Sequence, residues 1–416
     1  MNPIKILFRD KDLRNKILIS LLLLLIFRII SHIPIPWINK EALQLLSTSG
    51  VLSFANLFSG GALQNYTIMA TGISAYISAS IVVQILTFVS PKLHTISKEA
   101  GGEKRIKKLT IYLGVLSAIL SSFVTTSALE KTYGLLTSDK WYVYVVIAAL
   151  HAIGTGIAIF IGETITEKGF GNGVSLLIFI NIVTSFPSQI ETIIAMLRNK
   201  MTTPLTVFVC IIVVLITITL VTLSETSEHR LKIQYSQSAI RGQSFNNQGQ
   251  SFFPIKVNIA GVMPVIFASY VLQGLSIIMN LVDNETVTKI ITGFLTHGSA
   301  TYCIFMLVSI LGFSYIYNWL SFDTSDISKR IQERGGGIPG IRPGKPTKEY
   351  IDRIKYDLTF IGAVYLAIIT IIPMLIFNYL GLTLIASTSL IIMVGVSIET
   401  VNALSVEIKL RTRKSF

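Results

Sequence analysis

Few residues in this chain of 416 amino acids have types and spacing that could support catalysis or ion binding. Glu163 and Glu167 are four positions apart, which puts both carboxylates on one face of a helix, where they could bind a cation. No His or Asp lies near them in the sequence, so a structural role is the better interpretation. The five histidines show no metal-ligand spacing, and no Ser/His/Asp combination is present. We therefore expect no catalytic residue, no metal site and no cofactor.

Two glycine-rich segments invite comparison with nucleotide-binding loops. A phosphate-binding loop of the Walker type has the pattern G-x4-G-K-[ST]. In segment 335–347, Pro339 occupies the first glycine position of that pattern and Pro346 follows Lys345. The second segment, 169–173, reads Gly-Phe-Gly-Asn-Gly and is a turn between two apolar stretches. Neither segment predicts nucleotide binding, and the sequence does not indicate an enzyme.

The elements that carry these residues are long and apolar. Hydrophobic residues make up 51% of the chain and charged residues only 14%, whereas soluble domains carry about 25% charged residues. A helix needs about 20 residues to cross the hydrocarbon core of a membrane. On this criterion we expect an all-α integral membrane protein with ten transmembrane helices, at 17–37, 68–89, 106–129, 141–161, 174–194, 204–223, 257–281, 301–322, 358–378 and 382–403.

The basic residues are distributed unevenly between the gaps that separate these spans. Of the 35 Lys and Arg residues, 28 lie in the terminal segments and in alternate gaps, and Arg28 lies inside the first stretch. Positive residues are retained on the cytoplasmic side, so we expect a multi-pass protein of the inner membrane with both termini cytoplasmic. The basic start before Leu18 resembles a signal peptide but lacks a cleavage site, which indicates an uncleaved first helix. The net charge of +13 then faces anionic lipid and acidic or ribosomal partners.

Two long cytoplasmic segments, 224–256 and 321–356, are polar or basic. The Gln/Asn/Ser-rich stretch 243–251 in the first favours a hairpin or a mobile loop over a folded domain. Ten spans can divide into halves of five, residues 1–200 and 201–416. Inverted repeats of this kind are common in membrane transport proteins, although no internal sequence match supports a repeat here.

One apolar, glycine-rich segment, 54–65, is too short to span the membrane. It predicts either a re-entrant, plugging segment or an amphipathic helix on the outer surface. The following span carries small and hydroxyl residues that permit close helix packing. Within the spans, Arg28 and Glu399 are the only buried ionisable residues that we expect, and both lie near helix ends. An apolar pore therefore fits better than an ion-coupled secondary transporter of a small solute, which remains the alternative.

Four sequence blocks resemble the SecY family of protein-conducting channels, and the likeness runs from about Asp12 to Glu407. The first joins Asn56-Leu-Phe-Ser-Gly-Gly-Ala-Leu63 to Tyr76-Ile-Ser-Ala-Ser-Ile-Val-Val-Gln84, and the others are 162–175, 254–269 and 338–352. The resemblance implies an hourglass channel of two pseudo-symmetric, inverted halves with a short plug helix at about 52–64. It also implies the central subunit of a channel that passes unfolded polypeptides and releases apolar segments into lipid through a lateral gate.

Motif positions in these blocks imply roles for individual residues. A ring of aliphatic side chains at a constriction would block ions because it excludes water. The implied residues are, for the pore ring, Ile77, Ile81, Val174, Ile178, Ile266 and Ile392; for the plug, Phe58, Ser59, Gly60 and Gly61; for the lateral gate, Ser80, Gln84 and Ser269; and for partner docking, Arg230 and Arg342.

The resemblance also implies partners. These are small membrane subunits of the SecE and SecG type, the motor ATPase SecA or the ribosome, signal sequences, unfolded client proteins and membrane lipid. The membrane would be a bacterial inner membrane, or a thylakoid membrane if the chain is plastid-encoded. The family's arginine-rich turn here reads Glu225-Thr-Ser-Glu-His-Arg230, so the chain fits either a housekeeping channel or a second copy.

Overall fold

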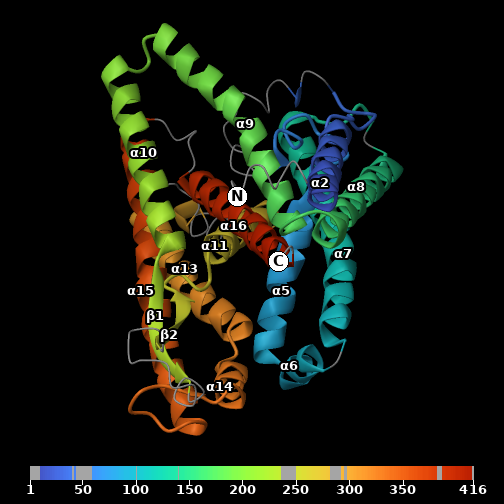
Figure 1. Ribbon diagram of the computed structural model, residues 1–416. Helices are drawn as coiled ribbons and strands as arrows, with labels where there is room; N and C mark the ends of the chain where they lie inside the picture. The colour runs from blue at the N-terminus through green and yellow to red at the C-terminus, as the bar shows by residue number, and fades with distance from the viewer. Residues whose placement is uncertain are drawn as a thin grey trace.

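The computed structural model describes residues 10–39, 42–43, 59–99, 101–138, 140–235, 250–281, 292–294, 298–381 and 387–414. Helices dominate the described chain (Figure 1). Their bounds are α2 (Lys11–Ile30), α5 (Gly72–Val89), α6 (Pro91–Lys98), α7 (Gly102–Tyr133), α8 (Trp141–Lys168), α9 (Gly173–Arg198), α10 (Pro204–Thr226), α11 (Met263–Leu281), α13 (Ala300–Ser321), α14 (Thr324–Glu333), α15 (Lys345–Tyr379) and α16 (Ser387–Lys414).

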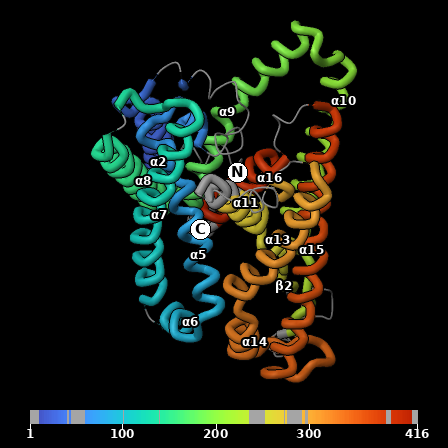
Figure 2. The backbone as a smooth tube through the Cα atoms, turned by 180° about the vertical axis from the view of Figure 1, so that it is seen from behind, coloured from blue at the N-terminus to red at the C-terminus, as the bar shows by residue number. Residues whose placement is uncertain are grey.

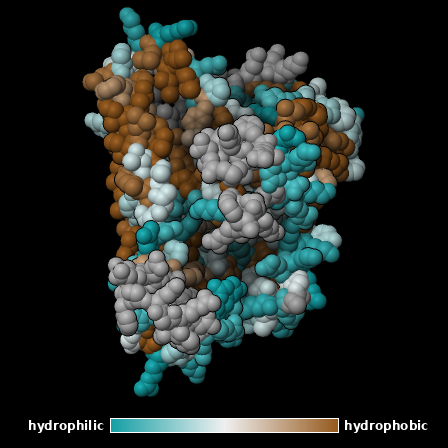
Figure 3. Space-filling view, in the orientation of Figure 1, coloured by the Kyte–Doolittle hydropathy of each residue, from teal (hydrophilic) through white to brown (hydrophobic). Residues whose placement is uncertain are grey.

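The ten predicted membrane spans correspond to ten of these helices. Eight described helices, α5, α7, α8, α9, α10, α13, α15 and α16, are long and apolar enough to cross a membrane. The remaining two predicted spans correspond to α2 and α11. Large apolar side chains cover the outside of α10, where Leu205, Phe208 and Leu215 are each more than half exposed (Figure 3). Such a surface is stable in lipid, and the ten-helix membrane fold is confirmed.

The helices form two groups with α11 and α16 between them (Figures 1 and 2). One group contains α2, α5, α7 and α8, and the other contains α10, α13 and α15. The α9 helix runs from the first group to the turn before α10, which lies at 199–203 between the two predicted halves. Packing between the groups involves α11 with α5 and α7, α13 with α5, and α16 with α9.

The two long segments predicted to be cytoplasmic contain more regular structure than the sequence predicted. Strands β1 (Glu228–Tyr235) and β2 (Gln250–Lys256) pair antiparallel, with Glu228 opposite Lys256, so the predicted hairpin is confirmed. A two-residue strand β3 (Gly336–Gly337) joins the other edge of β1. The expectation of an all-α chain thus omits a small three-stranded sheet. Its buried side chains pack with those of α14 and α15, in a cluster of Leu231, Ile233, Ile255, Ile331, Ile338, Ile351 and Leu358.

The α15 helix begins at Lys345, well before the predicted membrane entry at Leu358. Pro346 lies in its first turn, where a missing backbone N–H is tolerated. The first turns of α15 are polar, so a search for apolar stretches does not detect them as part of the helix. Segment 321–356 is therefore built largely from α14 and the start of α15 rather than from loop.

The turn between α8 and α9 shows why the block 162–175 is glycine-rich. A Cβ atom on Gly173 would lie 1.9 Å from the carbonyl oxygen of Gly162, so only glycine fits this close approach. The Asn172 side chain caps α9 by accepting from the backbone N–H of Val174 at 3.1 Å. This turn fixes the direction in which α9 starts, and with it the positions of Val174 and Ile178.

Candidate constriction, gate and docking surface

The six residues assigned to the pore ring come from four helices that meet between the two groups. The α5 helix supplies Ile77 and Ile81, which are four apart and so share one face. Val174 and Ile178 share a face of α9 in the same way, while α11 supplies Ile266 and α16 supplies Ile392. The five isoleucines are at most 5% exposed and belong to one apolar cluster, against which the half-buried Val174 packs. All six residues thus lie in or against one apolar cluster, and we call them the candidate constriction.

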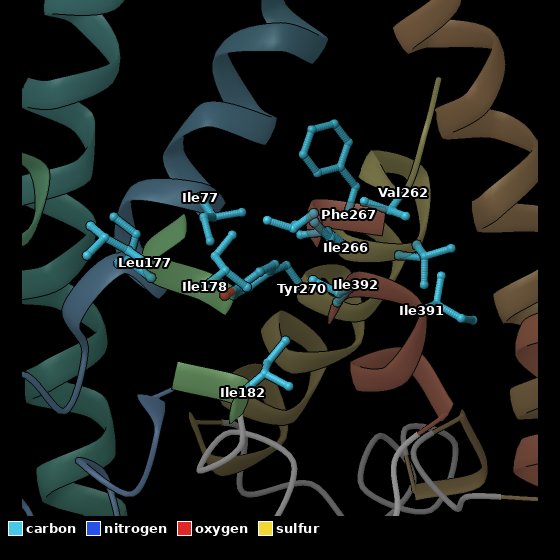
Figure 4. Packing of buried hydrophobic residues seen from close by; sticks show 14 of the residues in the cluster. Ile77, Leu177, Ile178, Ile182, Val262, Ile266, Phe267, Tyr270, Ile391 and Ile392 are labelled. Carbon is cyan, nitrogen blue, oxygen red and sulfur yellow. The ribbon is translucent and has the colours of Figure 1, made fainter. Parts of the chain in front are cut away.

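A close view shows the side chains of Ile77, Ile178, Ile266 and Ile392 converging from different helices (Figure 4). Aliphatic side chains cannot replace the hydration shell of an ion, so a closed ring of them blocks ions without binding any. Sequence reasoning missed three neighbours in the same cluster, Ile73, Ile182 and Tyr270. Each lies four residues from a predicted ring residue, so continuing the helical spacing was the signal that could have found them.

The residues assigned to the plug are only partly described. Phe58 and residues 52–57 of the predicted plug lie outside the described residues. Gly60 has φ +63°, and a Cβ atom there would lie 2.9 Å from both Arg28 Nη1 and Asn181 Oδ1. Glycine is therefore required by both backbone conformation and space. Ser59 and Gly61 are also described. The residue that follows them, Ala62, belongs to the same apolar cluster as the candidate constriction.

The three residues assigned to the lateral gate lie on α5 and α11, which pack together. Gln84 donates to the Ser80 hydroxyl at 3.2 Å within α5. The buried Ser269 donates to the carbonyl of Val265 at 2.8 Å within α11. Both of these hydrogen bonds are made within a single helix. Separating the two helices would therefore not break any of these bonds.

A set of contacts joins α5 and α6 to α13 and the start of α14, on the side that the distribution of basic residues predicts to be cytoplasmic. The Phe88 ring meets the Trp319 ring edge-on, with centroids 5.0 Å apart. The His94 ring lies 4.6 Å from the same Trp319 ring. Lys98 Nζ is 3.1 Å from Asp323 Oδ2, the side chain that also caps α14. We call these five residues the cytoplasmic clasp.

Sequence reasoning missed the cytoplasmic clasp. Its ion pair joins residues that are 225 positions apart. Neither side has a spacing or motif that points to the other, so no local signal was available. The contact depends entirely on how α5 and α13 meet in space.

The two arginines assigned to docking belong to one cytoplasmic unit. Arg230 is exposed on β1, opposite Pro254. Arg342 is exposed in the loop between β3 and α15, and its backbone carbonyl accepts a hydrogen bond from Thr347 Oγ1 at 2.9 Å. Because β3 pairs with β1, both arginines are carried by the same sheet. The described bond fixes the loop through its backbone and leaves the guanidinium group of Arg342 at the surface.

The expectation that Arg28 and Glu399 are the only buried ionisable residues in the spans is wrong. His151 on α8 is 1% exposed, and its Nδ1 atom is 2.6 Å from the Ser122 hydroxyl of α7. Since the buried Nε2 atom has no hydrogen-bond partner in the described part of the chain, the Ser122 hydroxyl, as the polar partner of Nδ1, offsets only part of the cost of burying an imidazole. Because that partner is 29 positions away on another helix, the apolar pattern around His151 gave no indication of it.

Glu163, considered above as a cation ligand, pairs instead with Lys107. The Lys107 Nζ–Glu163 Oε1 distance is 3.2 Å, and the pair joins α7 to α8 near their cytoplasmic ends. Across the part of the chain that the structure describes, no group of three or more His, Cys, Asp or Glu residues is placed to hold a metal ion.

Comparisons with known proteins agree with this architecture. The model of the SecY family matches residues 67–401. The chain is 35% identical over 427 residues to Protein translocase subunit SecY of Bacillus subtilis, covering 98% of this chain and 97% of that protein.

Solved structures match over nearly the whole chain. The structure described as that of a protein conducting channel has a TM-score of 0.70 at 15% identity and covers 96% of this chain and 93% of its own. Sec61 in the canine ribosome-channel complex has a TM-score of 0.65 at 14% identity, with the same coverage. The fold is therefore that of a ten-helix membrane channel. Together with the family match, this shows that the chain belongs to the SecY family, the channel subunits of protein translocases.

Proposed function

We propose that an unfolded polypeptide crosses the membrane through the candidate constriction of this chain. The observation that carries the proposal is the convergence of aliphatic side chains from α5, α9, α11 and α16, which belong to both predicted halves. Side chains without hydrogen-bonding groups close around a passing chain without selecting a sequence. The two halves, 1–200 and 201–416, would form the two sides of this pore.

The seam between α5 and α11 is the proposed lateral gate, with Ser80, Gln84 and Ser269 along it. Since these two hydrogen bonds lie within single helices, an apolar segment can separate the helices without breaking them. Transfer of such a segment into lipid is favourable by about 0.8 kcal/mol for each buried CH2 group. A signal segment would therefore leave the pore sideways through this seam.

The exposed cytoplasmic unit that carries Arg230 and Arg342 is the proposed docking surface for SecA or a ribosome. A planar guanidinium group can form two parallel hydrogen bonds with a carboxylate or a phosphate. The Sec61 match belongs to a ribosome-channel complex. Small subunits of the SecE and SecG type would complete the assembly. The bias of basic residues supports an orientation with both termini on the cytoplasmic side of a bacterial cell membrane.

Disulfide trapping of a stalled client protein tests this function directly. Cys210 and Cys303 would first be replaced by serine, and a single cysteine would then be placed at Ile81 or Ile178. A presecretory protein stalled in proteoliposomes, carrying one cysteine, should cross-link to both positions. The matched control is Val82→Cys, because Val82 is adjacent to Ile81 but 50% exposed on the outside of α5.

The proposal fails if Val82→Cys cross-links to the stalled client as efficiently as Ile81→Cys. It also fails if the proteoliposomes take up a small solute but no presecretory protein. The second result would favour a secondary transporter.

A further inference from the structure

A buried polar cluster lies between the segment 59–71 and helices α7 and α8, apart from the candidate constriction. Tyr66 is fully buried, and its hydroxyl oxygen lies 2.5 Å from Thr126 Oγ1. Its ring meets the His151 ring edge-on, with centroids 5.4 Å apart. His151 in turn bonds the Ser122 hydroxyl through its Nδ1 atom. We call Tyr66, Ser122, Thr126 and His151 the anchor cluster.

The direction of one hydrogen bond in the anchor cluster can be deduced. The Thr126 hydroxyl donates its hydrogen to the backbone carbonyl of Ser122 at 2.7 Å. Its oxygen must therefore accept the hydrogen of the Tyr66 hydroxyl, because a hydroxyl group has only one hydrogen to donate. Tyr66→Phe removes this donor and leaves the aromatic ring in place. It is thus a minimal change to the cluster.

The backbone beside Tyr66 is held from two further directions. The Tyr66 carbonyl accepts from the N–H of Ile35 at 3.3 Å, and the N–H of Ile68 donates to the carbonyl of Ile33 at 3.1 Å. On the other side, a Cβ atom on Gly154 of α8 would lie 2.1 Å from the Ile68 carbonyl oxygen. The chain therefore lies directly against α8 at a position that admits only glycine.

Tyr66 itself has a left-handed backbone conformation, with φ +44°. This conformation costs free energy for a residue with a side chain, and it persists only where surrounding contacts impose it. The anchor cluster supplies those contacts. The segment is thus fixed at Tyr66 by its side chain, its backbone and its packing.

The part of the segment just before Tyr66 packs beside the apolar cluster that contains the candidate constriction. Gly60 and Gly61 both have positive φ values, +63° and +87°. Gly60 lies against Arg28 and Asn181, and Ala62 belongs to the cluster that contains the candidate constriction. Residues 59–62 therefore pack at the apolar cluster that contains the candidate constriction, a few positions before a firmly held point.

We infer that the anchor cluster is a positioning device that holds residues 59–62 against the candidate constriction and so sets how tightly the resting channel is sealed. This inference rests on the proposed channel function. The resting population consists mostly of chains with the segment in place, and weakening the anchor raises the fraction with the segment displaced. Tyr66, Thr126 and His151 then act on the seal without lining the pore.

The test compares pairs of variants of the full-length chain reconstituted with the small subunits that it purifies with. Tyr66→Phe is compared with Tyr112→Phe, because Tyr112 lies on α7 but is 74% exposed. Thr126→Val, which removes the hydroxyl group, is compared with Thr126→Ser, which keeps it. Amide hydrogen exchange over residues 59–71 measures the anchor, and resting ion conductance measures the seal.

We expect Tyr66→Phe and Thr126→Val to speed exchange over 59–71 by about three- to ten-fold, which is the typical net contribution of one hydrogen bond. Resting conductance should rise by a similar factor. Tyr112→Phe and Thr126→Ser should match the parent chain in both measurements. Rescue by serine identifies the hydroxyl group, rather than packing at position 126, as the cause.

Unchanged exchange in Tyr66→Phe and Thr126→Val would overturn the anchor itself. Faster exchange with unchanged conductance would overturn its role in sealing while leaving the channel function to the cross-linking experiment. If Thr126→Val prevents folding, Tyr66→Phe decides, because it removes a single hydroxyl group and keeps the buried ring.

Discussion

The candidate constriction lies between the two groups of helices and the cytoplasmic clasp joins them, but the two regions are built from opposite chemistry. The constriction consists of aliphatic side chains that are almost fully buried. The cytoplasmic clasp consists of three contacting rings and one ion pair, and both charged side chains of that pair are about half exposed. The constriction excludes water, whereas the clasp is partly exposed to it.

Because of this difference, we expect the two regions to respond differently if the two groups of helices move apart. The constriction has no directional bonds, so a client chain can replace one apolar contact with another. Any polar group placed there has no partner and is costly. The cytoplasmic clasp gains little from an exposed ion pair and somewhat more from its aromatic contacts. We therefore expect the constriction to determine the seal and the clasp to adjust how readily the cytoplasmic side opens.

The largest effect should come from a polar residue in the constriction. Ile81→Asn or Ile266→Asn buries an amide whose lack of a partner costs on the order of 1–3 kcal/mol, and entry of water relieves that cost. We expect resting ion conductance in planar bilayers to rise at least about ten-fold, with relaxed selectivity for signal sequences. Ile81→Leu, which keeps an apolar side chain of the same size, should remain sealed. Unchanged resting conductance in both Asn variants would remove these residues from the pore.

The second prediction separates docking from gating on the cytoplasmic face. Arg342→Glu should leave the chain assembled in the membrane but abolish partner-driven translocation, since a carboxylate repels the acidic or phosphate group that arginine would bind. Binding of SecA or ribosomes, measured by co-sedimentation, should weaken and lose its salt dependence. The control is Arg353→Glu, the same charge change at an exposed position of α15.

Wild-type translocation by Arg342→Glu would show that the docking surface lies elsewhere. Loss of the folded protein would indicate that the arginine only supports its own loop. The described bond of that loop uses the Arg342 carbonyl, which the substitution keeps.

The apolar clustering of the residues assigned to the constriction could be predicted from the sequence, whereas the cytoplasmic clasp could not; the pore role of these residues stays a prediction. Ile77 and Ile81 lie four apart in a span, and the family likeness placed Ile266 and Ile392 beside them. The structure does bring these residues into one cluster. The ten spans could also be predicted from the sequence, because an apolar stretch of about 20 residues is a local property of the chain.

What the sequence could not reveal depends on contacts between distant segments. Trp319 reads as one apolar residue in a span, and only the packing of α13 against α5 brings it to Phe88. His151 reads as an isolated histidine, and its partner Ser122 lies on another helix. The polar start of α15 was missed for another reason. A search for apolar stretches finds the part of a helix that crosses the membrane, but not the part that extends beyond it.

A third prediction concerns the aromatic part of the cytoplasmic clasp. Trp319→Ala removes the ring that both Phe88 and His94 contact. Each aromatic contact contributes about 0.5–1.5 kcal/mol, so the clasp should weaken by about 1–3 kcal/mol. We expect translocation of clients with weak signal sequences to increase about five-fold or more, with little change in resting conductance. The control is Trp141→Ala, which removes a tryptophan that is 77% exposed at the start of α8.

A rise in ion leak for Trp319→Ala as large as that of the constriction variants would contradict the division between sealing and opening. The cytoplasmic clasp would then be part of the seal. Equal effects of Trp319→Ala and Trp141→Ala would show that loss of tryptophan at a membrane surface, rather than loss of the clasp, is responsible.

The smallest effect should come from the ion pair of the cytoplasmic clasp. Lys98→Gln removes the charge that faces Asp323 and keeps Asp323 free to cap α14 through the N–H groups of Ser325 and Asp326. The side chains of Lys98 and Asp323 are 59% and 46% exposed, so the loss should be below about 1 kcal/mol. At about 1 M salt the Debye length falls to about 3 Å, and the difference between Lys98→Gln and the parent chain in weak-signal translocation should then largely disappear. A difference that persists at high salt would mean that Lys98 contributes through packing of its aliphatic stem. In that case the clasp would resemble the constriction more closely than its charges suggest.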